Sequence, residues 1–192
     1  MTIEDENLIK MPYTMLVLSE SDLRDMISIT EDSTFHASTV QGVTPIISQV
    51  RTSSSSSCAY THPVTRKLRS IAANEFGVPE EFCEPMHLGK YGPGEQYKAH
   101  HDSCCDDSEA CVKFRERNGD RIGTMLVYLN DSFKGGHTSF PHLEISFEPK
   151  AGHAVFWTSS ACPAWALHAG EPVTEGTKLI ATVWVRGQQF LA

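Results

Sequence analysis

No apolar run in the 192-residue sequence is long enough to cross a bilayer, which takes about 20 residues. The longest apolar stretches, such as residues 125–129 and 179–185, are far shorter. We also expect no secretory signal, because residues 1–7 carry acidic side chains where a signal peptide carries basic ones, and the apolar run that follows is shorter than the roughly 7 to 15 residues of a signal peptide. We therefore expect no membrane partner and, by default, a cytoplasmic protein, with the oligomeric state left open.

Basic residues are in short supply. The chain has 16 Lys and Arg against 24 Asp and Glu, which gives a formal net charge of −8. Nucleic acids and anionic membrane surfaces are bound mainly through Lys and Arg side chains that neutralise phosphates. The charge balance therefore argues against nucleic acid as a partner.

Cysteine is too scarce for a disulfide scaffold, since there are six residues and no Cys-x-x-Cys pair. A chain of this length can bury a sizeable core without a disulfide or a structural metal, so any metal is expected to serve chemistry. Reduced thiols are the expectation for the cysteines. Cys104, Cys105 and Cys111 crowd one predicted loop, residues 103–118, so a disulfide or a second metal site there remains an alternative.

Two helices are predicted in the first half of the chain. One begins after Ser19, where Asp22 stands at the third helical position, and the other has Pro63 in its first turn and apolar residues at spacings of three and four. Between them, residues 33–60 are rich in Thr, Val and Ser and predict strands and a mobile loop. The serine run at residues 53–57 has too few apolar groups to pack, so we interpret it as a solvated loop or a lid.

From residue 84 onward, short apolar runs are separated by Gly, Pro and Asn-Asp. This pattern is typical of an antiparallel sandwich, and we predict a mainly β fold with flanking helices and a double-stranded β-helix, or jelly-roll, core. We expect one domain over residues 1–192, in which residues 1–83 support a core formed by residues 84–192. The runs that predict strands are residues 84–91, 97–102, 122–129, 143–147, 153–157, 165–169 and 179–185.

His100, His101 and Asp102 are consecutive in one predicted strand. Side chains alternate along a strand, so His100 and Asp102 share a face and His101 points away. His168 lies in another apolar strand segment, where an imidazole is unexpected unless it has a role. Two histidines and a carboxylate on adjacent strands form the facial triad of non-haem Fe(II), and zinc hydrolases can use the same ligand types. We therefore predict His100, Asp102 and His168 as metal ligands.

Lys178 distinguishes these two kinds of site. It opens a predicted strand ten residues after His168, and we expect that strand to return beside the His168 strand and to aim the ammonium into the sandwich. A buried lysine is costly without an anion to pair with. The far carboxylate of 2-oxoglutarate, whose other end chelates iron, is such an anion. The alternative is a lysine that reaches solvent at the start of its strand.

With these residues in place, the sequence resembles the prolyl 4-hydroxylase family of Fe(II)- and 2-oxoglutarate-dependent dioxygenases. The resemblance covers nearly the whole chain and is most specific in the second half. Residues 50–54 are similar to the start of the family's loop over the peptide substrate. The other segments that carry the resemblance are residues 91–102, 121–131, 135–141, 149–152, 167–173 and 176–178, together with Trp184.

The resemblance implies that the chain hydroxylates proline in a peptide or protein with O2 and 2-oxoglutarate, releasing succinate and CO2, with Fe(II) and ascorbate as cofactors. The iron ligands that it implies are His100, Asp102 and His168. The 2-oxoglutarate site that it implies consists of Lys178, Tyr91 and Thr138. The residues that it implies around the substrate are Tyr97, Arg121, Trp184 and Arg51.

Two departures from the family pattern concern the substrate. The chain continues with serines where the family's loop often has Gly, and residues 103–118 add cysteines at the rim. One alternative is therefore a 2-oxoglutarate dioxygenase that acts on a lysyl or other side chain, a free amino acid or a small metabolite.

A different class is a jelly-roll module that binds a metal or small ligand without turnover, against which the interior Lys178 argues. A zinc hydrolase would need a general base, and no carboxylate near His100 or His168 presents itself. The remaining histidines that we expect to be structural or superficial are His87, His137, His142 and His153.

Overall fold

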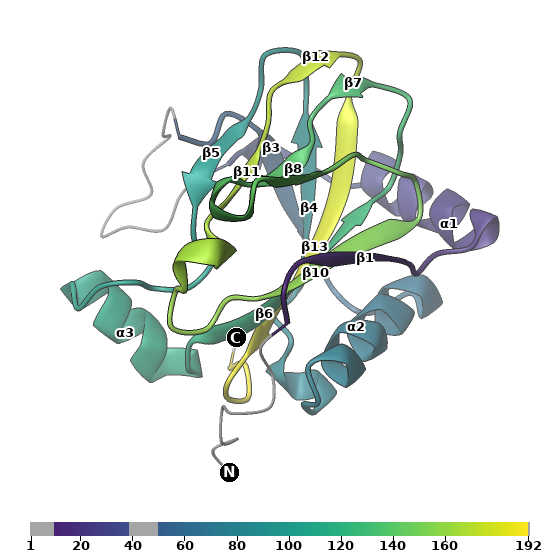
Figure 1. Ribbon diagram of the computed structural model, residues 1–192. Coiled ribbons are helices and arrows are strands. Elements are labelled where there is room, and N and C mark those ends of the chain that lie inside the picture. The colour runs from purple at the N-terminus through teal and green to yellow at the C-terminus, as the bar shows by residue number, and fades with distance from the viewer. Residues whose placement is uncertain (1–9, 39–49, 192) are drawn as a thin grey trace.

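The computed structural model in Figure 1 describes residues 10–38 and 50–191. Its strands, in chain order, are β1 (Tyr13–Leu16), β2 (His36–Ala37), β3 (Ser54–Cys58), β4 (Met86–Tyr91), β5 (Tyr97–His100), β6 (Arg121–Tyr128), β7 (Lys134–Gly135), β8 (Thr138–Phe140), β9 (Ile145–Phe147), β10 (His153–Thr158), β11 (His168–Gly170), β12 (Val173–Glu175) and β13 (Lys178–Arg186). Its α-helices are α1 (Glu20–Glu31), α2 (Pro63–Glu75) and α3 (Glu109–Asn118).

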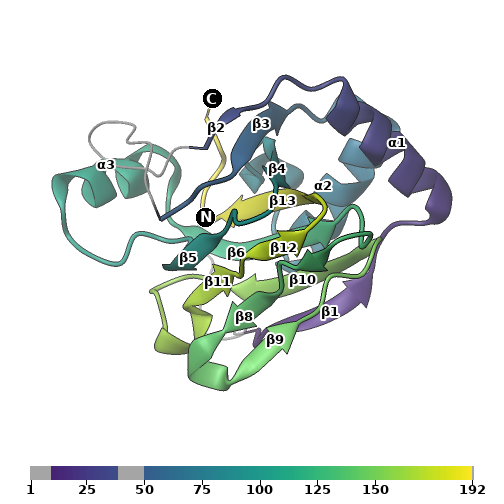
Figure 2. The ribbon, with the colours of Figure 1, turned by 90° about the horizontal axis from the view of Figure 1, so that it is seen from above.

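Two antiparallel sheets form the body of the protein. The large sheet has the order β1-β10-β6-β13-β4-β3-β2, the small sheet has the order β5-β11-β8-β9, and β7 pairs with β12 in a separate ribbon. The small sheet lies over one face of the large sheet (Figure 2). Aromatic and aliphatic side chains from both sheets fill the space between them. This arrangement confirms the predicted mainly β fold with a jelly-roll core.

Both predicted helices are confirmed, and they lie against the other face of the large sheet (Figure 1). Ser19 caps α1 through a capping box, in which its hydroxyl accepts from the Asp22 amide and the Asp22 carboxylate accepts from the Ser19 amide. Pro63 occupies the first turn of α2. The absence of a side chain at Gly123 lets Phe76 approach β6, since a Cβ at Gly123 would lie 2.2 Å from the Phe76 ring.

Strand alternation divides the side chains between these two interfaces. On β13, one set packs toward the helices: Leu179, Ala181, Val183 and Val185. The alternate set lines the space between the sheets: Lys178, Ile180, Thr182 and Trp184. The helix side therefore supplies the main apolar core, and the other face of the same strand is available for the site.

Several local expectations are wrong. The serine run is neither a loop nor a lid, because residues 54–58 form β3 and pair with β4 from Ser54↔Lys90 to Cys58↔Met86. The predicted loop at residues 103–118 contains α3. The segment at residues 165–167 is not a strand, since a 3-10 helix (Ala164–Ala166) precedes β11. Part of the predicted loop at residues 33–60, residues 39–49, lies outside the described residues.

Four of the six cysteines form disulfides, which corrects the expectation of reduced thiols and agrees with the alternative left open for the cysteine-rich segment. Cys104 is joined to Cys111 and Cys105 to Cys162, with Cα–Cα distances of 5.2 and 5.5 Å. Cys58 and Cys83 are free. The first disulfide fastens the start of α3 to the segment before it, and the second ties that segment to the loop between β10 and β11.

No helix in the described part of the chain is both long and apolar enough to cross a membrane.

Candidate active site

The predicted triad is assembled by the pairing of β5 with β11. His100, the last residue of β5, stands directly opposite His168, the first residue of β11. Asp102 follows two residues after His100, in the turn beyond the strand. One nitrogen from each of the two rings and one carboxylate oxygen lie within 4.8 Å of one another. The structure thus brings together all three residues that the sequence predicts as ligands.

Backbone carbonyls fix the orientation of both imidazoles. His100 Nδ1 lies 2.8 Å from the Lys98 carbonyl, and His168 Nδ1 lies 3.0 Å from the Ala166 carbonyl. A carbonyl can only accept, so each Nδ1 carries the proton and each Nε2 presents its lone pair. These Nε2 atoms lie 3.8 and 3.7 Å from the two oxygens of Asp102. Both rings therefore face the carboxylate with the atom that can bind a metal.

The Asp102 carboxylate is almost completely buried, with a side-chain exposure of 5%. Burial by itself would raise its pKa, but neighbouring positive charge, including the Arg121 guanidinium, holds the pKa below its usual value. The Thr124 hydroxyl donates to Asp102 Oδ2 at 2.7 Å. The carboxylate is thus kept charged and oriented.

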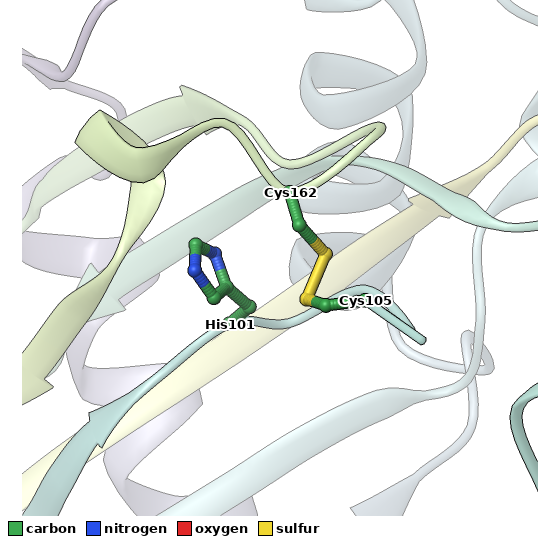
Figure 3. A group of neighbouring side chains, drawn as sticks. All are labelled: His101, Cys105 and Cys162. Atoms are coloured by element: carbon green, nitrogen blue, oxygen red, sulfur yellow. A yellow bond between two sulfur atoms is a disulfide. The ribbon is translucent and has the colours of Figure 1, made fainter. Parts of the chain in front are cut away.

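His101 is grouped with two cysteines rather than with this triad. One nitrogen of its ring lies within 4.8 Å of the sulfurs of Cys105 and Cys162, and Figure 3 shows these three side chains. The strand expected to carry all three consecutive residues ends at His100, so His101 and Asp102 lie beyond β5 and strand alternation does not account for their separation.

Lys178 lies deep between the sheets, with an exposure of 3%. The Lys178 ammonium donates to the Gly136 carbonyl at 2.5 Å and lies over the rings of Tyr91 and Tyr128. Burial lowers its pKa from 10.5 to about 7, against a smaller opposing effect of Glu171. The expected strand neighbour is wrong: β13 belongs to the large sheet, so Lys178 faces the sheet of His168 rather than lying beside it.

One cavity contains the triad and the lysine together. The predicted residues that line it are His100, Asp102, His168, Lys178, Tyr91 and Thr138. The Thr138 hydroxyl accepts from Tyr128 Oη at 2.7 Å, which leaves its own proton free to donate to a ligand. Apolar walls are provided by Leu126, Trp157 and Ile180.

A groove of about 830 Å³ adjoins this cavity. All four predicted substrate residues line it: Arg51, Tyr97, Arg121 and Trp184. Tyr97 stacks on the His100 ring with a centroid distance of 3.4 Å. The Arg51 guanidinium lies over the Tyr97 ring, at 4.9 Å from the centroid. The groove and the cavity share Arg51, Tyr97, Asp102 and Trp184, so the groove opens onto the triad.

Arg121 is held in a buried charge network. Its guanidinium donates to both oxygens of Glu84, at 2.6 and 2.9 Å, and Arg186 donates to the same carboxylate at 2.6 Å. The guanidinium also lies 3.8 Å from the centre of the Trp184 ring and donates to the Asp102 carbonyl. Arg121 therefore connects the wall of the groove to the triad.

Sequence reasoning missed several residues that support these positions. His87 was expected to be structural, yet it lines the groove, lies 3.3 Å from an Arg51 nitrogen and contacts the Trp184 ring. Alternation from Tyr91 along β4 is the signal that could have placed it. Three further supporting residues contact the site only through partners distant in the sequence, so no local sequence pattern predicts them: Glu84, Thr124 and Tyr128.

The profile of the 2OG-Fe(II) oxygenase superfamily matches residues 86–186. The chain belongs to this superfamily. Membership implies Fe(II) and 2-oxoglutarate, and the donors present fit both. Two imidazole nitrogens and a carboxylate form the ligand set that non-haem iron takes, and the buried ammonium in the same cavity suits a carboxylate.

Curated relatives of this oxygenase confirm the resemblance to prolyl 4-hydroxylases. A protein of Acanthamoeba polyphaga mimivirus, provisionally named a prolyl 4-hydroxylase, is 43% identical over 134 residues, which is 67% of this chain and 55% of the relative. Prolyl 4-hydroxylase subunit alpha-1 of Homo sapiens is 34% identical over 137 residues, which is 68% of this chain and 26% of that protein. The chain thus spans about half of one relative and a quarter of the other.

A solved structure agrees with the same assignment. The viral collagen prolyl hydroxylase of Paramecium Bursaria Chlorella virus-1, in complex with 2-oxoglutarate, superposes on the oxygenase with a TM-score of 0.71 and 25% identity. The superposition covers 92% of this chain and 96% of that one.

Proposed function

We propose that this oxygenase hydroxylates proline in a peptide or protein, consuming O2 and 2-oxoglutarate and releasing succinate and CO2. The observation that carries the proposal is the shared cavity, in which a facial triad and a buried lysine face one space that opens onto a long groove. The relatives and the superposed structure, which are named as prolyl hydroxylases, support the choice of substrate.

In this proposal, His100, Asp102 and His168 hold Fe(II). The bound iron and its 2-oxo acid supply the oxidising chemistry, in which one oxygen atom of O2 enters succinate and the other enters the substrate C–H bond. The carbonyl partners of the two rings keep both Nε2 atoms aimed at one point, so the ligand set is preorganised. Ascorbate is proposed as the reductant that keeps the iron in its Fe(II) state.

The Lys178 ammonium binds the far carboxylate of 2-oxoglutarate. Only one of its three N–H donors is used by Gly136, and the ammonium gains an anionic partner when the diacid enters. The hydroxyls of Tyr91 and Thr138 line the same cavity and add hydrogen bonds to the carboxylate. Burial of this end of the cavity excludes water from the ion pair.

The groove holds the proline-containing segment. Tyr97 and Trp184 supply ring surfaces for the pyrrolidine, and extended proline-rich chains suit an aromatic groove because little ordering entropy is lost on binding. The buried Trp184 Nε1 has no hydrogen-bond partner among the described residues, and it is free to donate to a peptide carbonyl. The guanidinium groups of Arg121 and Arg51 lie over the Trp184 and Tyr97 rings, respectively, and hold them in position.

The test measures succinate release and peptide mass together. The protein is incubated with Fe(II), ascorbate, 2-oxoglutarate and a proline-rich peptide, with the same peptide carrying Ala for Pro as the matched control. We expect one added oxygen on proline and succinate release that depends on the proline. Loss of both in His168→Ala, at unchanged folding, ties the reaction to the triad.

The outcomes separate the alternatives. If proline peptides stay unmodified while a lysine-containing peptide or a small metabolite stimulates succinate release, the prolyl assignment is wrong and the dioxygenase assignment stands. If no succinate is released with any candidate substrate, nor from 2-oxoglutarate alone, the enzyme assignment is wrong and the protein is a binding module without turnover.

A further inference from the structure

A second cluster of metal-binding side chains lies beside the triad but outside it. Cys105 and Cys162 are joined by a disulfide, and the His101 ring stands next to them (Figure 3). One ring nitrogen and the two sulfurs lie within 4.8 Å of one another. Cys105 is exposed, and His101 and Cys162 are half-buried, so a reductant in solution can reach the disulfide.

The cluster has the donor set and nearly the spacing of a zinc-type site. With Zn–S bonds of about 2.3 Å and Zn–N bonds of about 2.0 Å, tetrahedral ligand atoms lie about 3.5 to 3.8 Å apart. The sulfurs must separate from their bonded distance, and the Cα–Cα distance of 5.5 Å leaves room for that change by side-chain rotation. The imidazole must move toward the sulfurs by only about 1 Å.

The backbone around Cys162 is shaped to hold its side chain at this place. Ala161 and Cys162 both have positive φ, at 55° and 47°, a conformation that non-glycine residues adopt only when the surrounding structure imposes it. The Ser103 carbonyl lies 3.4 Å from Cys105 Sγ and 3.7 Å from Cys162 Sγ. Both sulfurs therefore contact the Ser103 carbonyl. Ser103 belongs to the segment that connects His101 with Cys105.

We propose that His101, Cys105 and Cys162 form a thiol-gated metal site, closed by the disulfide under oxidising conditions and open to a zinc-type divalent cation after reduction. Opening needs a two-electron disulfide reductant, and a thiol of the dithiol or glutathione class serves as one. Two reductant thiols transfer two electrons and two protons to the Cys105–Cys162 disulfide, which yields two cysteine thiols and one reductant disulfide. Metal binding then releases the two thiol protons, and water occupies the fourth position.

This site differs in chemistry from the neighbouring triad. Thiolates select softer cations such as zinc, whereas two imidazoles and a carboxylate suit iron. The two sites are joined by the chain itself, because His101 lies between the predicted iron ligands His100 and Asp102. The new site thus ties the segment after β5 to the loop before β11 through either a disulfide or a metal.

The test uses Co(II) as the probe, because thiolate ligation gives an intense near-ultraviolet charge-transfer band that imidazole and carboxylate ligation does not give. The full chain is reduced with a phosphine under argon and titrated with Co(II). We expect the thiolate band in the reduced wild type, its absence in the oxidised wild type, and its loss in Cys162→Ser. His101→Ala should weaken the Co(II) affinity of the thiolate site by about tenfold or more.

Two controls separate this cluster from its surroundings. The double variant Cys104→Ser/Cys111→Ser removes the other disulfide and should keep the band, and His168→Ala disables the triad and should also keep it. His101→Ala retains both cysteines of the cluster, so it tests the site even if Cys162→Ser does not fold. A reduced wild type without a thiolate band, a band that persists in Cys162→Ser, or an unchanged affinity in His101→Ala would overturn the proposal.

Discussion

Lys178→Met should stabilise the protein in the absence of ligands and abolish its response to 2-oxoglutarate. Burial lowers the Lys178 pKa from 10.5 to about 7, and a difference of this size corresponds to a free-energy cost of about 5 kcal/mol for keeping the ammonium charged. Methionine has a similar length and no charge. The substitution therefore removes the free-energy cost of burying a charged ammonium. In the wild type this cost is offset only when an anion binds beside Lys178.

The expected gain in the unfolding free energy of Lys178→Met is smaller than the full cost of burying the ammonium. The lost hydrogen bond to the Gly136 carbonyl is worth about 1 kcal/mol, and the tyrosine rings beside the ammonium contribute about another 1 kcal/mol. About 3 kcal/mol of added unfolding free energy remains as the prediction for Lys178→Met at pH 6.

The pH dependence gives a second check with a defined sign. Between pH 7 and 10.5 the unfolded wild type holds a proton on this lysine that the folded wild type has released, so the unfolding free energy of the wild type rises with pH over this interval. The advantage of Lys178→Met should therefore be complete below pH 7, fall by about 1.4 kcal/mol per pH unit above pH 7, disappear near pH 9 and reverse at higher pH.

Urea denaturation of both proteins in a chelating buffer, at a series of pH values, measures these differences. The matched control is Lys134→Met, because Lys134 is exposed on β7 and pairs with Glu175 at the surface. That variant should leave stability nearly unchanged. With Mn(II) present, added 2-oxoglutarate should raise the melting temperature of the wild type and of Lys134→Met but not that of Lys178→Met. Equal stability of wild type and Lys178→Met at pH 6, or a difference that does not vary with pH, would refute the reasoning.

Two further substitutions test the surroundings of the site. Thr138→Val removes a hydroxyl from the cavity, and the KM for 2-oxoglutarate in a succinate assay should rise by about tenfold or less, for about 1 kcal/mol of lost hydrogen bonding, while the KM for peptide stays the same; an equal rise in both would contradict the assignment. Gly123→Ala places a Cβ within 2.2 Å of the Phe76 ring and should cost about 1 to 3 kcal/mol of unfolding free energy in urea denaturation, whereas an unchanged midpoint would show that α2 moves away without cost.

The starts of the first two helices follow from the sequence alone. The capping pair Ser19 and Asp22 and the proline at position 63 predicted both helices, because capping and φ restriction act within a few residues. The sequence also predicted that His101 would not join His100 and Asp102, although β5 ends at His100 and strand alternation is not the reason. Lys178 stood out because a charge in an apolar strand demands a partner.

The strand β3 could not be predicted from the local sequence. Residues 54–58 carry no apolar pattern, and β3 exists because its backbone groups pair with β4. The helix α3 likewise has a weak pattern of its own, and it is held by the Cys104–Cys111 disulfide and by Phe114 against the guanidinium groups of Arg121 and Arg186. Such partners lie far away in the chain, so no window of sequence reveals them.

The site itself required the tertiary structure. Residue spacing suggested that the two histidines lie on adjacent strands, but only the pairing of β5 with β11 sets His100 opposite His168. Only the topology places Lys178 on the facing sheet, and only packing joins Arg121 to Glu84 and Cys105 to Cys162. Local sequence determined which side chains carry the chemistry, whereas their convergence depends on contacts between strands distant in the chain, which no local propensity encodes.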